Sequence, residues 1–187
     1  MRVIAGSAGG LRLNVPESDV RPTMDRVKAA IFSSLGDRVL NARILDLFAG
    51  TGALGIEALS RGAASALFVE NKREAVFTIE QNFIRTKLRG RVRRQDVFAF
   101  LETSSPNECF DIIFADPPYE KTKGGEEFTR LLLANEKLPK VLARSGVFVL
   151  EKRPAEELPA HPQWEILRSR KYGATEVLVL QHADPDE

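Results

Sequence analysis

An aspartate, two prolines and a tyrosine follow the apolar run of residues 110–115, which reads as a buried strand. The carboxylate of Asp116 is a hydrogen-bond acceptor, while Pro117 and Pro118 fix their own φ and keep each preceding residue extended. A backbone carbonyl of the proline pair is therefore held still beside the carboxylate, and Tyr119 adds a flat face for stacking. Two rigid acceptors beside an aromatic ring suit an exocyclic base amine, whose nitrogen must be oriented before it can attack. The structural alternative is a simple Pro-Pro strand terminator.

A glycine fingerprint lies earlier in the chain, between a strand and a helix. Gly50, Gly52 and Gly55 form a Gly-x-Gly-x-x-Gly pattern directly after the apolar run of residues 42–49. Glycines permit a tight turn and the close approach of a ligand, and the helix start offers free N–H groups. Glu70 ends the next apolar run, where a carboxylate can accept both hydroxyls of a ribose. The pattern predicts a nucleotide-type cofactor but does not separate a dinucleotide from S-adenosylmethionine.

Two further acids distinguish these cofactors. Asp46 precedes the glycine loop, where a carboxylate repels a pyrophosphate but attracts an ammonium and a sulfonium. Asp96 is placed to accept from an adenine amino group, with Val97 and Phe98 against the ring; its alternative is a helix N-cap. We therefore expect S-adenosylmethionine as cofactor, S-adenosylhomocysteine as its product, and no metal. The expected cofactor residues are Asp46, Phe48, Gly50, Gly52, Glu70, Asn71, Asp96, Val97 and Asp116, and the expected catalytic residues are Asp116, Pro117, Pro118 and Tyr119.

Strands and helices alternate from residue 42 onward and would position these residues. Strands are predicted at 42–49, 66–70, 91–96, 110–115 and 146–152, and helices at 54–62, 72–88, 97–102, 126–138 and 140–145. Near-continuous apolar strands separated by helices indicate a parallel sheet covered on both faces. Residues 164–181 read as two strands around a tight turn, forming an antiparallel edge. The predicted fold is a doubly wound α/β sheet with an N-terminal extension, made of extended pieces at 2–6 and 11–15 and a helix over 21–35.

The bulk composition fits one globular domain. The 187 residues are 43% hydrophobic and 28% charged, with a formal net charge of +1. We expect an N-terminal hairpin and helix in residues 1–40, a catalytic core in 41–182 and an acidic tail in 183–187. A single cysteine suits a reducing compartment, and the two histidines lie far apart, so no metal site is expected. No apolar run reaches the length of a signal peptide or membrane span, which predicts a cytoplasmic protein without membrane association.

Three stretches, "RPTMDRVKAAIFSSL", "LDLFAGTGALGIEALSRGA" and "DPPY", together resemble the bacterial RsmD-type methyltransferase family, from Met1 to about His182. The resemblance implies a Rossmann-like, seven-stranded class I methyltransferase sheet. It also implies methyl transfer from S-adenosylmethionine to the exocyclic N2 amine of a guanine in 16S ribosomal RNA. By this resemblance Asp46, Gly50, Gly52, Glu70 and Asp96 bind the cofactor, and Asp116, Pro117 and Tyr119 hold the guanine.

The same resemblance implies an N-terminal hairpin that helps to grip RNA, although "GSAGGLRL" departs from the family in carrying one basic residue, and Met24 replaces a small polar one. The expected RNA-contacting residues are Arg12, Arg21, Thr23, Arg26, Lys28, Lys121 and Lys123. The densest basic stretch, "KLRGRVRR" at 87–94, is explained equally well as a solvated face. The expected partner is 16S rRNA, within the small subunit or an assembly intermediate, and the expected state is a monomer.

Three alternatives remain open at this point. A DNA or RNA adenine-N6 methyltransferase would share the glycine loop and the Asp-Pro-Pro-Tyr motif, although on DNA it usually needs a separate target-recognition domain. A dinucleotide-dependent oxidoreductase would account for Gly50 to Glu70 but not for Asp46 or the proline pair. An RNA-binding protein that has lost activity would not require Asp116 and Tyr119, which are intact here.

Overall fold

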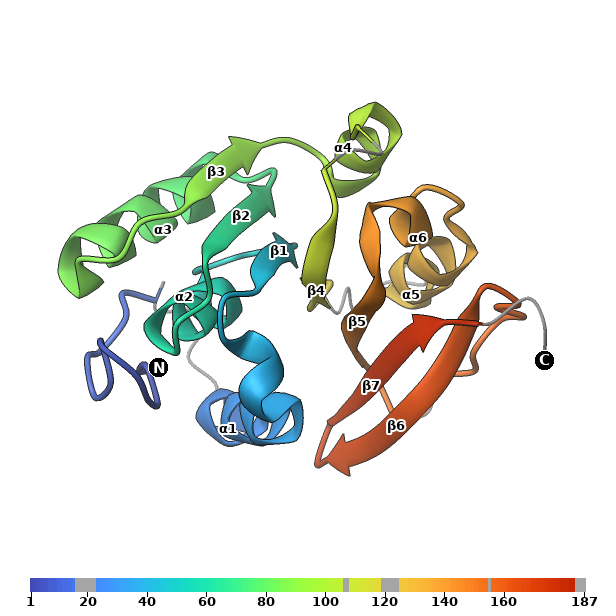
Figure 1. The fold of residues 1–187 in the computed structure, drawn as a ribbon, viewed down its shortest axis with the longest axis horizontal. Coiled ribbons are helices and arrows are strands. Elements are labelled where there is room, and N and C mark those ends of the chain that lie inside the picture. The colour runs from blue at the N-terminus through green and yellow to red at the C-terminus, as the bar shows by residue number, and fades with distance from the viewer. Residues whose placement is uncertain (16–22, 106–107, 119–124, 155, 184–187) are drawn as a thin grey trace.

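A computed structural model describes the chain except for residues 16–22, 106–107, 119–124, 155 and 184–187, and it leaves the side chains of 23–24 and 125–127 undescribed. Its centre is a seven-stranded sheet in the order β3-β2-β1-β4-β5-β7-β6 (Figure 1). The strands are β1 (Arg43–Leu47), β2 (Ser65–Glu70), β3 (Arg91–Arg94), β4 (Phe110–Ala115), β5 (Leu142–Lys152), β6 (Trp164–Tyr172) and β7 (Thr175–His182). The helices are α1 (Thr23–Leu35), the 3-10 turn η2 (Gly36–Val39), α2 (Ala53–Ser60), α3 (Arg73–Thr86), α4 (Val97–Thr103), α5 (Gly125–Ala134) and α6 (Leu138–Val141).

The strand order reverses direction at β1. This strand pairs in parallel with β2 on one side and with β4 on the other, and β3 and β5 continue the parallel sheet outward. Strand β7 enters antiparallel between β5 and the edge strand β6, as predicted for residues 164–181. In open α/β sheets, ligands bind beyond the carboxyl ends of the strands where the order reverses. The topology therefore points to the ends of β1 and β4.

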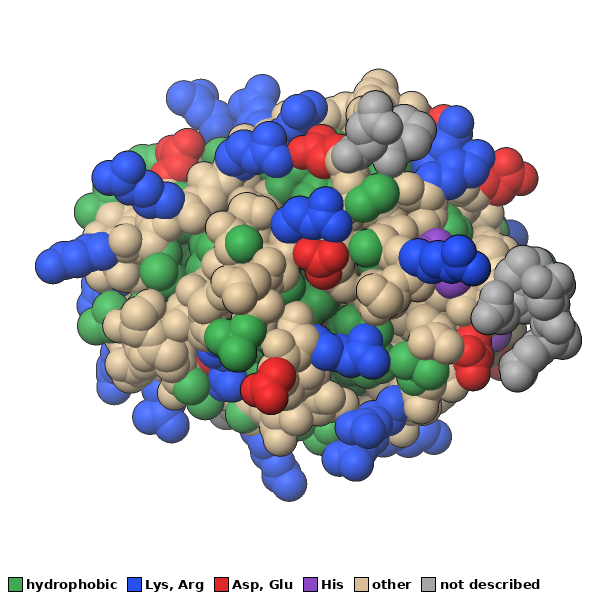
Figure 2. All heavy atoms as spheres, viewed as in Figure 1, with side chains coloured by type: hydrophobic (Ala, Val, Ile, Leu, Met, Phe, Trp, Pro, Cys, Tyr) green, Lys and Arg blue, Asp and Glu red, His purple; other side chains and the backbone are tan. Residues whose placement is uncertain are grey.

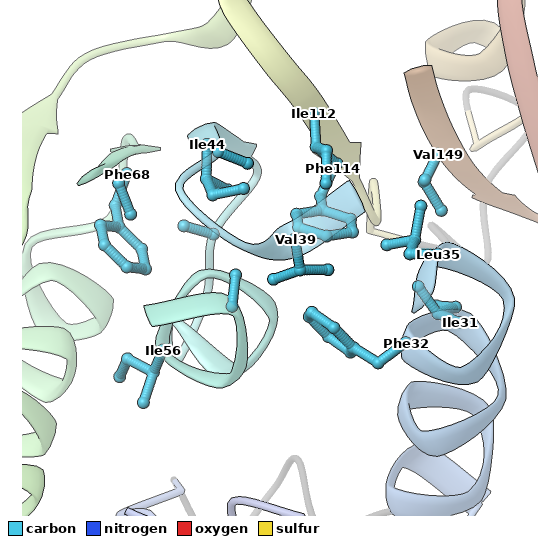
Figure 3. Close-up of a cluster of buried hydrophobic side chains, with 14 of the residues drawn as sticks. Ile31, Phe32, Leu35, Val39, Ile44, Ile56, Phe68, Ile112, Phe114 and Val149 are labelled. Atoms are coloured by element: carbon cyan, nitrogen blue, oxygen red, sulfur yellow. The ribbon is translucent and has the colours of Figure 1, made fainter. Parts of the chain in front are cut away.

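Helices cover both faces of the sheet, which confirms the doubly wound prediction. One face packs against α1, α2 and α3, where Phe32 and Leu35 meet Phe114 and Val149 from the strands (Figure 3). The other face packs against α4, α5 and α6 around Leu45 and other strand residues. Strand residues that alternate between two buried faces must be apolar at nearly every position, which explains the continuous apolar runs.

One local prediction was wrong. Residues 140–145 were expected to be helical, but α6 ends at Val141 and β5 begins at Leu142. Leu142 is buried and pairs with Phe110 of β4, so tertiary pairing overrides the weak helical pattern. The N-terminal pieces 2–6 and 11–15, predicted to be extended around a turn, do lie antiparallel: a bridge joins Arg2 and Arg12, and the N–H groups of Val3 and Leu13 donate to the carbonyls of Leu11 and Met1 at 2.9 and 3.1 Å.

The N-terminal segment is held to the body by a buried carboxylate on α2. Glu57 is fully buried, and its oxygens accept hydrogen bonds from the backbone N–H groups of Ile4 at 2.7 Å and Ala5 at 3.1 Å. The same carboxylate pairs with Lys28 of α1 at 3.3 Å and with Arg61 at 2.7 Å. Four donors compensate the buried charge, so the segment, α1 and α2 form one unit.

Neither a membrane span nor a metal cluster is found in the described part of the chain. No helix there is long and apolar enough to cross a membrane. Within the same residues, no group of three or more His, Cys, Asp or Glu side chains is arranged to hold a metal ion.

Candidate active site at the carboxyl ends of the central strands

The three glycines after β1 have three different structural roles. Gly50 has a φ of +54°, and an added Cβ would meet only one atom within 4 Å, the Phe48 carbonyl oxygen at 3.9 Å. Gly52, at φ +76°, is the N-cap of α2. At Gly55 an added Cβ would lie 2.3 Å from the ring of Phe68, so only glycine lets α2 approach β2 this closely. The fingerprint thus opens a turn and packs the helix behind it, as its spacing predicts.

Four carboxylates lie on one face of the sheet, at or near the ends of adjacent strands. Asp46, Glu70, Asp116 and Glu151 each follow by two residues a side chain that packs on the face covered by α1, α2 and α3: Ile44, Phe68, Phe114 and Val149. Side chains alternate along a strand, so all four carboxylates point to that face. The registers place Asp116 and Glu151 next to each other, one residue beyond the pair Ala115–Leu150. We call these four residues the acidic row.

Asp46 is the most deeply buried member of the acidic row. Its side chain is 2% exposed, and its Oδ2 accepts a hydrogen bond of 2.9 Å from the N–H of Gly55. Burial, followed by the charges of Asp116 and Glu70, raises the pKa of Asp46 to about 8, against the lowering effect of the Gly55 hydrogen bond. The free protein therefore holds a proton here at neutral pH, and a bound cation would displace it.

Glu70 secures the glycine loop to the sheet. It is 8% exposed, and Oε2 accepts from the N–H of Gly50 at 2.9 Å while Oε1 accepts from the N–H of Lys72 at 2.8 Å. Each carboxylate oxygen has a second lone pair, so these bonds leave acceptor capacity for a ribose hydroxyl. Asn71, also expected at the cofactor, directly follows Glu70 and is exposed.

Glu151 is the member of the acidic row that sequence reasoning missed. It lies on β5, half-buried, and burial followed by the charges of Asp116 and Asp46 raises the pKa of its carboxyl well above the usual range. The available signal was the acid in "GVFVLEK", which interrupts an apolar strand at the same height as Asp116. Without the β4–β5 register, that glutamate looks like an ordinary strand end.

Asp96 caps α4, the structural role weighed as its alternative. Its Oδ1 accepts from the N–H groups of Phe98 and Ala99, both at 3.0 Å. Both bonds fall on one oxygen, so a role toward an adenine amine stays a prediction. Val97 is buried, and Phe98 lies beside an aromatic cluster.

The aromatic cluster consists of Phe48, Phe98 and Phe128. Phe48 has an unusual φ of +55° and directly follows β1. It is level with Glu70 at the end of β2 and with Asp116 just after β4. Its ring is 6.3 Å from that of Phe98 and 5.4 Å from that of Phe128, edge-on to both, while the rings of Phe98 and Phe128 are stacked 6.2 Å apart. Phe128, on α5, was not expected from the sequence. The half-buried rings form an apolar wall suited to a flat base.

The proline motif begins where β4 ends, as predicted. Asp116 is half-buried, Pro117 is buried and Pro118 is exposed. Tyr119, the expected stacking residue, lies outside the described residues. Within the motif, the structure therefore places Asp116 in the acidic row, with Pro117 directly after it.

Six of the seven expected RNA-contacting residues are either exposed or not fully described. Arg12 and Arg26 are exposed. Arg21, Lys121 and Lys123 lie outside the described residues, and Thr23 begins α1 without a described side chain.

The prediction for Lys28 is wrong. Its side chain is 4% exposed, pairs with Glu57 at 3.3 Å and donates to the carbonyl of Arg2 at 2.6 Å. Burial lowers the pKa of its ammonium, an effect partly offset by Glu57. On an amphipathic helix the sequence alone does not show that a buried partner lies opposite this position.

S-adenosylmethionine fits the residues found here. Asp46, Glu70 and Glu151 make no ion pair with any described lysine, arginine or histidine. Three neighbouring carboxylates that pair with no described cation favour a ligand that brings positive charge, and this cofactor carries a sulfonium and an ammonium. A pyrophosphate at the glycine loop would instead lie close to the Asp46 carboxylate, which accepts from the N–H of Gly55 at the start of α2.

Comparison with known proteins identifies relatives along nearly the whole chain. The family described as "Conserved hypothetical protein 95" matches residues 1–181. YlbH of Bacillus subtilis (strain 168) is 37% identical, with 97% of this chain and 98% of the relative covered. Ribosomal RNA small subunit methyltransferase D of Escherichia coli (strain K12) is 35% identical, with 92% of this chain and 85% of the relative covered.

Solved structures agree with these relatives. The structure of yhhF from Escherichia coli superposes with a TM-score of 0.80 at 33% identity, covering 97% of each chain. A Thermus thermophilus 16S rRNA N2 G1207 methyltransferase, solved with AdoMet and guanosine, shares the fold at a TM-score of 0.68 and 22% identity, with 89% of this chain and 44% of that one covered. The chain belongs to the conserved hypothetical protein 95 family, the RsmD-type methyltransferase family that its sequence motifs resemble.

Proposed function

We propose that the protein transfers a methyl group from S-adenosylmethionine to the exocyclic N2 amine of a guanine in 16S rRNA. The observation that carries the proposal is the acidic row: carboxylates from β1, β2, β4 and β5 meet on one face, with the Asp-Pro-Pro motif at the end of β4. The relatives named ribosomal RNA small subunit methyltransferase D support the RNA substrate. The N2 position rests on the family resemblance.

The proposed cofactor-binding residues contact different parts of the cofactor. Asp46 faces its positively charged amino acid end, and Glu70 accepts from the ribose hydroxyls. Asp96 and Val97 lie next to the adenine, beside the wall made by Phe48 and its neighbours. The free N–H groups at the start of α2, beyond Gly50 and Gly52, meet the carboxylate of the amino acid end.

The acceptors at the end of β4 are proposed to orient the amine. When bound, the cofactor supplies a methyl group on a sulfonium, which needs an in-line nucleophile. The Asp116 carboxylate and a carbonyl of the proline pair accept the two amine hydrogens and direct the nitrogen lone pair along that line. As the nitrogen–carbon bond forms and the carbon–sulfur bond breaks, the nitrogen becomes acidic and its proton leaves, so a weak base such as Asp116 suffices. Tyr119 provides the stacking face by family resemblance.

The partner and cellular setting follow from this substrate. We propose that the enzyme acts as a monomer on 16S rRNA within the small subunit or an assembly intermediate, in the cytoplasm. Relatives named as methyltransferases do not favour the dinucleotide oxidoreductase, which the residues of the acidic row also disfavour.

Methyl-labelled S-adenosylmethionine, offered with unmodified small subunits, naked 16S rRNA or DNA, tests the proposal. After digestion to nucleosides, mass spectrometry identifies the labelled base. N2-methylguanosine from RNA is expected, and the better RNA acceptor shows at which stage the enzyme acts. Labelled N6-methyladenine would be compatible with the proposed role of the proline motif but would overturn the assignment of guanine as the target base. If cofactor binds but no base is labelled, the protein is an inactive binding protein.

A further inference from the structure

Positive charge is concentrated on one short segment of this nearly neutral protein. Residues 72–94, which comprise α3 and β3 with their flanks, contain eight lysines and arginines and two glutamates. The segment therefore carries a charge of +6 in a chain whose total is +1, and the other residues together carry −5. The basic residues are Lys72, Arg73, Arg85, Lys87, Arg89, Arg91, Arg93 and Arg94. We call these eight side chains the α3–β3 basic surface.

Every member of the α3–β3 basic surface is exposed. Among the described residues, only Arg91 forms an ion pair, with Glu108 at 2.7 Å, and Arg85 donates weakly to Asn14 at 3.5 Å. Figure 2 shows lysine and arginine side chains gathered at the upper left rim of the molecule, where Figure 1 places β3 and α3. Like charges this close repel one another, so the cluster favours a polyanionic partner.

The surface is continuous with the proposed cofactor site. Arg94 is the cross-strand neighbour of Glu70, and the N–H of Gln95 donates to the Glu70 carbonyl at 3.1 Å. From there β3 leads away from the acidic row, and Lys87 and Arg89 lie in the turn at its far end. Adjacent strands are about 4.8 Å apart, so three strand spacings separate β3 from β4, roughly 14 Å. An RNA whose base reaches Asp116 can therefore lay its backbone across β3.

Protection of the sheet edge does not account for this charge. Strand β3 is an edge strand, and charged side chains on an edge discourage pairing with another chain. That role needs charges on the strand, whereas Arg73, Arg85, Lys87 and Arg89 lie on α3 or in its connection to β3. The other edge strand, β6, also ends in basic residues, but together with its preceding connection (residues 153–172) it carries a net charge of only +1.

We propose that the α3–β3 basic surface binds the phosphate backbone of the substrate RNA and so docks the target guanine over the acidic row. The inference rests on the proposed function, and it assigns most of the RNA affinity to this surface instead of the sparsely charged N-terminal segment. Contacts of this kind fix the position of the RNA without reading its sequence.

A triple substitution tests the proposal directly. Lys87→Gln, Arg89→Gln and Arg93→Gln remove three charges from the surface, and the matched control, Arg144→Gln, Arg170→Gln and Lys171→Gln, removes the same three from exposed positions on β5 and β6. Methyl transfer is measured on unmodified 16S rRNA made in vitro and on small subunits reconstituted from it. Binding of the same RNA is followed from low to high salt, and calorimetry measures S-adenosylmethionine binding.

The expected result is a KM for RNA raised on the order of tenfold in the surface variant, with kcat and cofactor affinity unchanged. The plot of log affinity against log salt should become less steep by about 2, since each of the three lost phosphate contacts contributes about 0.7 to 0.9 to the size of the slope. An equal loss in both variants would show a net-charge effect and overturn the proposal, as would no loss in either. A loss on subunits without a loss on naked RNA would assign the surface to a ribosomal protein instead.

Two controls keep the outcomes separable. Thermal melting verifies that each variant is folded, and ultraviolet cross-linking of the wild-type protein to 16S rRNA asks whether peptides from residues 85–94 carry RNA. Absence of that cross-link, with cross-links elsewhere, contradicts the proposal without any variant. If wild-type protein binds RNA through this surface but methylates nothing, the proposed function fails while the docking surface stands.

Discussion

Replacing Asp46 by asparagine should make the protein less sensitive to rising pH. The carboxyl has an ordinary pKa of 3.8 in an unfolded chain and about 8 in the folded protein, so between these values the folded state binds one more proton. The stability that the protonated Asp46 carboxyl contributes is therefore fully present below about pH 4 and is lost as the pH rises toward 8. One proton corresponds to about 1.4 kcal/mol per pH unit. From pH 5 to pH 8 the wild type should lose about 4 kcal/mol relative to Asp46→Asn.

The amide of asparagine can still accept from the N–H of Gly55, so the substitution removes the charge and preserves the loop. Urea unfolding of both proteins at pH 5, 6, 7 and 8 gives the difference in free energy of unfolding at each pH. Asp37→Asn, the same change at an exposed position, is the matched control. A difference between wild type and Asp46→Asn that stays constant over this range would refute the reasoning, because burial would then not have shifted the proton equilibrium.

Four further outcomes are expected. S-adenosylmethionine should bind more tightly as the pH rises from 6 to 8 and release a proton, which calorimetry in buffers of different ionisation enthalpy detects; Asp46→Asn should bind weakly without that release. Asp116→Ala should lower kcat at least about 100-fold while cofactor affinity stays nearly intact, and equal losses of both would contradict its role at the amine. Glu151→Gln should raise the melting temperature at pH 8 by several degrees and change it little near pH 4, since its raised pKa has the same sign of effect as that of Asp46. Glu57→Ala should destabilise the protein by about 3–5 kcal/mol, and Lys28→Met by less, with RNA affinity unchanged in the latter; weaker RNA binding in a folded Lys28→Met would restore the surface role.

Much of the fold was predictable because the central parallel strands must be apolar on both faces. That constraint produced readable runs, and the glycine fingerprint marked the first strand and helix independently. The error fell where local pattern and tertiary pairing disagree. Residues 140–145 look helical, yet Leu142 pairs with β4.

The site was predictable where a residue type is unusual for its local position. Asp46 before a glycine loop and Asp116 before two prolines contradict the demands of a buried strand, so each signals a function. Glu151 shows this contradiction only weakly, as an acid near a strand end, and Phe128 not at all, because the importance of both depends on which strand or helix lies beside them. Lys28 shows the converse: a basic residue near a helix start suggests RNA, and only the fold reveals Glu57 beneath it.

The order of the strands divides the protein into two consecutive halves that meet along one line. Residues before 104 build β3-β2-β1, and residues after 109 build β4-β5-β7-β6, so the β1–β4 boundary is the single place where the halves pair within the sheet. Asp46, Glu70 and Asp96 belong to the first half, and Asp116 and Glu151 to the second. A chain cut between residues 104 and 109 should therefore yield two inactive fragments whose reassociation restores methyl transfer. If each fragment were fused to one of two other proteins, methyl transfer would then report that those two proteins had bound to each other.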